Sequence, residues 1–203
     1  MKKQAGFSII ELAVVMVVIG MMLMSAMPLM NDWMRNAKLR NQAEALQSGL
    51  QVARNEAVRR NQAITFYMVS SDSATTLTDS CAVSANGTSW VVSVRDPAGE
   101  CAAAPAVTSS DGSNPLIVRT HLGADGASGV SVSGLASDGT TAASSVTFDA
   151  FGRASGGLVR INVSYATGQA TDRNMRVDIS PAGMVRMCDT AITDSSDPRR
   201  CPS

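Results

Sequence analysis

The residues with the clearest capacity for chemistry lie near the amino terminus, where an acid interrupts an apolar run. Glu11 is the only charged residue between Phe7 and Met30. A carboxylate inside a bilayer costs at least about 2.5–3.5 kcal/mol, so it normally has a partner. A cut after Gly6 would free the α-amine of Phe7, with a pKa of about 7.7–8, on the same helix face as Glu11. We expect Glu11 to neutralise this amine or that of a neighbouring copy; the alternative is an acid near the interface that stays hydrated.

The element that would position these groups is a helix over residues 7–30. These 24 residues would form a helix about 36 Å long, enough to cross a hydrocarbon core of about 30 Å. Lys2 and Lys3 precede the helix, which favours a cytoplasmic amino terminus. The sequence therefore predicts one membrane crossing, with the carboxyl-terminal bulk of the chain on the other side.

The stretch Gly6–Leu12 (Gly-Phe-Ser-Ile-Ile-Glu-Leu) resembles the class III signal of type IV pilins and type II secretion pseudopilins. The resemblance implies that residues 1–6 are a leader, which prepilin peptidase removes by cutting after Gly6. It also implies N-methylation of the new terminus at Phe7 and a role for Glu11 in subunit assembly. Ser8 stands where these families more often have Thr.

The resemblance extends to Pro28, which lies where many pilins have a helix-kinking proline. The alternative is that Pro28 marks the exit from the membrane. The resemblance implies a bacterial inner-membrane protein that crosses the lipid bilayer once, with its carboxyl-terminal domain in the periplasm. Such a protein later enters a pilus or a pseudopilus.

Composition limits the other function classes. Lys plus Arg and Asp plus Glu each number 17, so a net charge near zero gives no general argument for binding nucleic acid.

The cysteines are even in number and all follow the membrane segment, which favours two disulfides. Of three connectivities we favour Cys81–Cys101 and Cys188–Cys201, because each pair brackets a turn-rich segment. Zinc is the alternative, but the gaps lack close Cys-x-x-Cys spacing, so we expect no metal and no cofactor.

Residues 31–62 are predicted to continue the helix in amphipathic form. Apolar residues recur there at steps of three and four, on one helical face: Ala43, Leu46, Leu50, Ala53 and Ala57. Polar and charged residues occupy the other face. We interpret Arg54, Arg59 and Arg60 as solvated residues of that face.

Residues 63–203 have the composition of a β-rich globular head domain. Short runs with β-type composition, several of them alternating apolar and polar residues, are separated by Gly-, Ser- and Pro-rich turns. The predicted strands are Ala63–Val69, Ser89–Arg95, Pro115–His121, Val130–Ser133, Ser145–Asp149, Leu158–Tyr165, Met175–Ser180 and Met184–Cys188. The expected fold class is α+β, with a long amino-terminal helix packed on an antiparallel sheet.

This order of helix and strands resembles the GspH/FimT family of minor pilins and pseudopilins, including FimU-like members. Two further stretches carry the likeness: Val146–Arg153, a strand followed by a Gly turn, and Ile179–Cys188, a terminal hairpin with a late Cys. The resemblance implies that the partners are other major and minor pilins in a filament, and prepilin peptidase.

Catalysis has little support in the sequence. The chain has one histidine, His121, which we interpret as a surface or loop residue, and it lacks Walker, HExxH and GxSxG motifs. We predict no catalytic residues.

DNA is a second kind of partner to consider. Some FimT-type pilins bind DNA through Gly-Arg-x-Arg, and the matching stretch here is Gly183–Arg186, in which Met184 replaces the first Arg. Arg186, Arg199 and Arg200 could form a small basic patch, although so few cations would bind DNA weakly and in a salt-sensitive way. The alternative is ordinary surface arginines around a disulfide loop.

The leading functional hypothesis is a minor type IV pilin that helps to initiate or cap pilus assembly. The alternatives are a GspH-like minor pseudopilin of type II secretion and a DNA-binding competence pilin.

Overall fold

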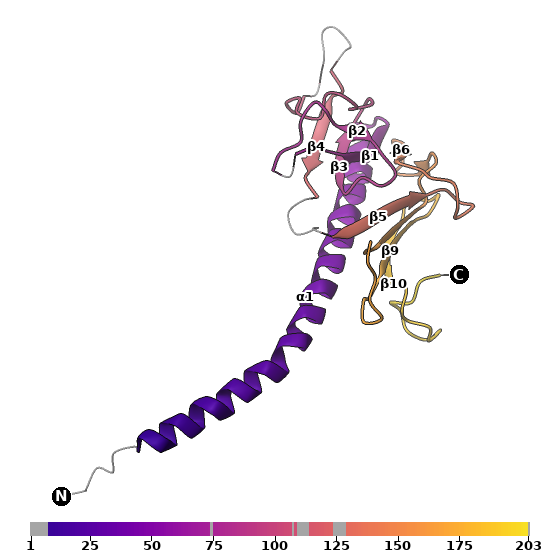
Figure 1. Ribbon diagram of the computed structural model, residues 1–203. Coiled ribbons are helices and arrows are strands. Elements are labelled where there is room, and N and C mark those ends of the chain that lie inside the picture. Colours follow the sequence, from indigo (N-terminus) through magenta and orange to yellow (C-terminus); the bar gives the residue numbers. More distant parts are fainter. Residues whose placement is uncertain (1–7, 74, 107, 109–113, 124–128, 203) are drawn as a thin grey trace, which may run out of the picture. The chain divides into compact units, whose positions relative to one another are not determined.

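A computed structural model (Figure 1) describes residues 8–73, 75–106, 108, 114–123 and 129–202, apart from the side chains of residues 23–29. The chain divides into two compact units, residues 1–35 and 36–203. One helix, α1 (Ile9–Arg60), begins in the first unit and ends in the second. The first unit is otherwise the amino-terminal segment, and the second contains all ten strands assigned among the described residues.

Within the second unit, α1 uses the apolar face that the sequence predicts. Its small and aliphatic residues have no exposed surface: Ala43, Leu46, Leu50, Ala53 and Ala57. Gly49 lies on the same helix, and a Cβ built there would lie 2.7 Å from the Trp90 ring. Alanines and this glycine therefore let α1 approach the strands closely.

The helix ends one turn before the first strand. Asn61 has a φ of 52°, the left-handed conformation that commonly ends helices. The N–H of Gln62 donates to the carbonyl of Ala57 at 3.1 Å, which satisfies one of the last helical carbonyls.

The first sheet has the strand order β4-β3-β1-β6-β7, and β2 also pairs with β1. All of these pairs are antiparallel. The central strand β1 begins directly after the helix turn and is buried along most of its length. The strands are β1 (Ile64–Ser70), β2 (Ala82–Val83), β3 (Ser89–Ser93), β4 (Ile117–His121), β6 (Ser145–Phe148) and β7 (Ala154–Ser155).

The second sheet has the order β10-β9-β8-β5 and is also antiparallel. Three of its strands, β5, β8 and β9, alternate buried and more exposed residues, as in half-buried sheets. The strands are β5 (Val130–Leu135), β8 (Arg160–Tyr165), β9 (Met175–Ile179) and β10 (Val185–Asp189). One apolar core joins the helix face with residues of both sheets, including Phe66, Phe148, Ile161 and Val177.

The predicted α+β class is confirmed, and each predicted strand segment overlaps a strand. The head has two sheets rather than the one expected. The two-residue strands β2 and β7 were not predicted, because two residues show no alternation. The predicted strand at Pro115 starts later, at Ile117, since Leu116 has a φ of 54° and the pairing register shifts between Val92 and Ser93.

Candidate assembly surfaces

The amino-terminal segment carries the predicted processing and assembly residues. Gly6 and Phe7 lie outside the described residues. Glu11 lies in the first turn of α1 and its side chain is exposed. A carboxylate in this turn is favoured by the positive end of the helix dipole. The Glu11 carboxylate is therefore free of burial by the described part of the chain.

The helix around Glu11 is apolar on every side. Each large apolar residue from Ile9 to Met22 is exposed, from 90 % for Ile9 to 45 % for Val18. Helices that are hydrophobic all round are typically buried, in the core of a large protein or in a membrane. Among the residues whose side chains are described, no helix reaches the length and hydropathy of a membrane span. Of the predicted span, residues 7–30, Phe7 and the side chains of residues 23–29 lie outside the described part of the chain.

Pro28 lies within α1, whose backbone is helical from Ile9 to Arg60. Its side chain is outside the described set, so the kink stays a prediction.

Two disulfides close loops in the head. Cys81 is bonded to Cys101 and Cys188 to Cys201, with Cα–Cα distances of 6.1 and 4.9 Å. These are the favoured pairings, and the described chain has no free cysteine. Zinc ligation by these residues is therefore wrong for this structure, because both sulfur pairs are bonded to each other.

The three arginines proposed for DNA surround the second disulfide loop, but the side chains of two of them make contacts within the head. The Arg186 guanidinium donates to the carbonyls of Pro198 at 2.6 Å and Arg200 at 3.0 Å. Arg199 pairs with Asp197 at 2.7 Å, and hydrogen bonds from Arg199 lower the pKa of Asp197 to about 2. Arg200 forms a bridge with Asp189 of β10 through its backbone. These contacts fix the carboxyl-terminal loop against strand β10.

The helix arginines differ from the expectation of a uniformly solvated face. The Nε of Arg54 donates to the carbonyl of Gly152 at 3.2 Å, so this side chain ties α1 to the β6–β7 turn. Arg59 and Arg60 both pair with Glu56 at 2.7 Å, and the Arg60 side chain is only 21 % exposed. Arg54 and Arg60 are therefore partly buried and bonded within the chain, so the face is less solvated at these two residues than expected.

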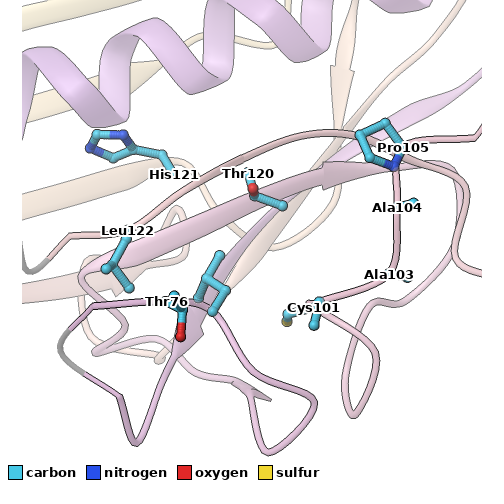
Figure 2. Close-up of a pocket in the computed structure, with 10 residues that line it drawn as sticks. Thr76, Cys101, Ala103, Ala104, Pro105, Thr120, His121 and Leu122 are labelled. Atoms are coloured by element: carbon cyan, nitrogen blue, oxygen red, sulfur yellow. The ribbon is translucent and has the colours of Figure 1, made fainter.

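His121 lies at the end of β4 beside a hollow of about 370 Å³ (Figure 2). Its imidazole stacks on Trp90 with 5.4 Å between ring centroids, and Figure 2 shows it pointing away from Cys101 and Thr76. The hollow is otherwise lined mainly by Ala, Thr, Leu and Pro. In the described part of the chain, no group of three His, Cys, Asp or Glu residues is placed to hold a metal.

Comparison with protein families identifies the head. The family described as Type II transport protein GspH matches residues 42–183, which is more than half of the chain. The chain belongs to the GspH family. The family described as Prokaryotic N-terminal methylation motif matches residues 1–27, the segment that contains Gly6, Phe7 and Glu11.

Two solved structures resemble this GspH-family chain, both of the type IV minor pilin FimU of Pseudomonas aeruginosa in different crystal forms. One has 20 % identity and a TM-score of 0.44, covering 77 % of this chain and 98 % of the FimU chain. The other has 20 % identity and a TM-score of 0.46, covering 79 % and 95 %. No curated protein matches the chain.

Two turns of the GspH-family head lie where the sequence showed family-like stretches, and they are packed together. Gly152, in the β6–β7 turn, has a φ of 75°, and Gly183, in the β9–β10 turn, a φ of 76°. A Cβ at Gly183 would lie 1.8 Å from the carbonyl oxygen of Gly152. Sequence reasoning identified both glycine turns but not their contact, because contacts between distant hairpins leave no local pattern.

Proposed function

We propose that this chain is a minor type IV pilin, a structural subunit rather than an enzyme, that helps to initiate or cap a pilus. The observation that carries the proposal is a methylation motif at residues 1–27 joined to a GspH-family head. In this proposal residues 1–6 are the leader, 7–30 the membrane and filament-core helix, 31–62 its amphipathic continuation, and 63–203 the head.

The proposed mechanism starts in the inner membrane, where the helix lies in lipid with the head in the periplasm. Prepilin peptidase cuts after Gly6, and the new Phe7 terminus is N-methylated. The exposed apolar side chains from Ile9 to Met22 then exchange lipid for the helices of other pilins. Glu11 neutralises the Phe7 amine of a neighbour, which removes the cost of burying either charge alone.

A minor pseudopilin of type II secretion is the second candidate, because the matched family carries a type II transport description. The same cleavage and helix packing would serve it, and the two candidates differ in which system's subunits surround the chain. A role in DNA uptake has weaker support, since Arg186 and Arg199 already contact groups of the head.

The test is Glu11→Val in the full chain, measured as the amount recovered in fibres sheared from cells. We expect recovery to fall at least about tenfold, because one buried amine would lose its partner. Glu44→Gln is the matched control: Glu44 lies on the same helix, but it is exposed and pairs with Arg40 at 2.8 Å. Such surface pairs contribute little, so this variant should enter fibres normally.

Mass analysis of the recovered protein separates processing from assembly. A mature terminus at methylated Phe7 is expected for wild type and for both variants. Normal recovery of Glu11→Val in fibres would refute the assembly role, and retention of Lys2 and Lys3 in fibres would refute the processing step.

A further inference from the structure

Three exposed apolar side chains lie at the end of the head where α1 stops. They are Val58, Phe151 and Met184, which are 52, 79 and 65 % exposed. Among the described residues of 36–203, every other large apolar residue is buried or only partly exposed. Single exposed apolar residues are ordinary, but a grouping of this kind marks interaction sites.

The three residues belong to different elements that contact one another. A Cβ at Gly152, next to Phe151, would lie 3.2 Å from Cγ2 of Val58. Gly183, next to Met184, approaches the Gly152 carbonyl, and the N–H of Ala154 donates to the Pro181 carbonyl at 3.0 Å. These contacts bring the segments that carry the three residues together at one end of the head, and we call the three residues the tip patch: Val58, Phe151 and Met184.

The Phe151 turn is held in one conformation. Asp149 Oδ1 accepts hydrogen bonds from the N–H groups of Phe151 and Arg153, both at 2.9 Å. The Arg153 Nε donates to Asp149 Oδ2 at 2.8 Å, and its guanidinium carbon lies 5.3 Å from the centroid of the Phe151 ring. A side chain presented on a preorganised turn loses less entropy on binding than one on a flexible loop.

The charges around the tip patch are unequal. Segments 54–60, 149–153 and 180–184 contain four arginines, at 54, 59, 60 and 153, against two carboxylates, Glu56 and Asp149. Two positive charges are therefore in excess. Aromatic, Met and Arg residues are also the types enriched at the centres of protein interfaces. The patch thus suits a protein surface that is apolar at its centre and acidic at its rim.

We propose that the tip patch docks a neighbouring, different pilin-like subunit through a pocket that receives Phe151 and is bordered by carboxylates. This inference rests on the proposed function, since it assumes a pilin-like neighbour. The ring fills the pocket, and the excess arginine charge faces the acidic rim and sets the orientation.

The test uses the full chain in cells that assemble the fibre, with Met184 replaced by the photo-crosslinking residue p-benzoylphenylalanine. Irradiation should join the chain to a second pilin-like polypeptide, at a peptide that mass analysis places within a few residues of Asp or Glu. Adding Phe151→Ser should lower the adduct yield on the order of tenfold, as for an aromatic anchor. Adding Arg153→Glu should lower it as well.

Arg119→Glu is the matched control, because it reverses the same charge at an exposed position of β4. It should leave the adduct yield unchanged. An adduct with a second copy of this chain or with lipid, or a yield that Phe151→Ser does not change, would overturn the proposal. If the protein is present in sheared fibres but forms no adduct, only the tip patch is refuted; absence from fibres refutes the proposed function itself.

Discussion

Gly49→Ala tests whether the close approach of α1 to the first sheet is required. Alanine is favoured over glycine in a helix by about 1 kcal/mol, so propensity alone predicts a more stable protein. The structure predicts the opposite. The added Cβ would lie 2.7 Å from two atoms of the Trp90 ring and 2.8 Å from Cε2 of Phe66.

These rings have little room to move. Ordinary contacts begin near 3.4 Å, so the helix or the rings must shift by roughly 0.7 Å. Phe66 is fully buried and Trp90 is 3 % exposed; Trp90 also packs on Phe66 at 5.9 Å and stacks on His121. Overpacking of a core costs about 1–3 kcal/mol. We expect the upper part of that range here, which leaves a net loss of about 1–2 kcal/mol.

The measurement is thermal unfolding of the full chain in detergent micelles. A loss of this size should lower Tm by roughly 2–8 °C for a chain of this length. Gly20→Ala is the matched control, because it lies on the same helix and its Cβ would meet no described atom within 4 Å. That variant should not lower Tm. An unchanged or higher Tm for Gly49→Ala would refute the reasoning, since the helix would then tolerate a larger spacing.

Three further changes address the turns and the carboxyl-terminal loop. Gly183→Ala should destabilise the head by more than about 2 kcal/mol, because it combines a left-handed φ with a backbone clash at Gly152; a Tm within 2 °C of wild type would contradict this. Cys188→Ser should remove about 3 kcal/mol, the loop-closure contribution for a separation of 13 residues, measured by denaturant unfolding. Hydrogen bonds from Arg199 lower the pKa of Asp197 to about 2. The ionised Asp197 carboxylate therefore contributes fully to the stability of the head at pH values above the ordinary carboxyl pKa range. That contribution should disappear as the pH falls from about 4 to 2, and Asp197→Asn should flatten that part of the stability profile.

The helix face and the strands were predictable because each follows from a local repeat. The stripe from Ala43 to Ala57 has helical spacing, and every member is fully buried. Likewise Ile161, Val163 and Val177 alternate with polar neighbours and all have no exposed surface. Such patterns are imposed by a single hydrophobic core on nearby residues, so a short window of sequence contains them.

What the sequence did not reveal depends on contacts between distant segments. The division of the strands into two sheets depends on which strands pair, and nothing in β6 itself indicates that it pairs with β1. Arg54 shows the same limit at the level of one side chain, because its partner is a carbonyl about a hundred residues later. Phe151 left one usable signal, since an aromatic residue within a Gly turn is unusual where turn chemistry favours polar residues.

The number of arginines around the second disulfide loop is a poor guide to DNA binding. The Arg186 guanidinium donates to two backbone carbonyls and Arg199 pairs with a carboxylate, so both side chains already have partners within the head. Affinity for a polyanion rises with the number of phosphates that a protein neutralises. To neutralise a phosphate, Arg186 and Arg199 would first have to break their contacts within the head. An aromatic ring on a fixed turn has no such requirement, because it needs only one complementary pocket. Recognition by this head is therefore expected to depend mainly on the shape of the tip patch, with charge setting the orientation of the partner.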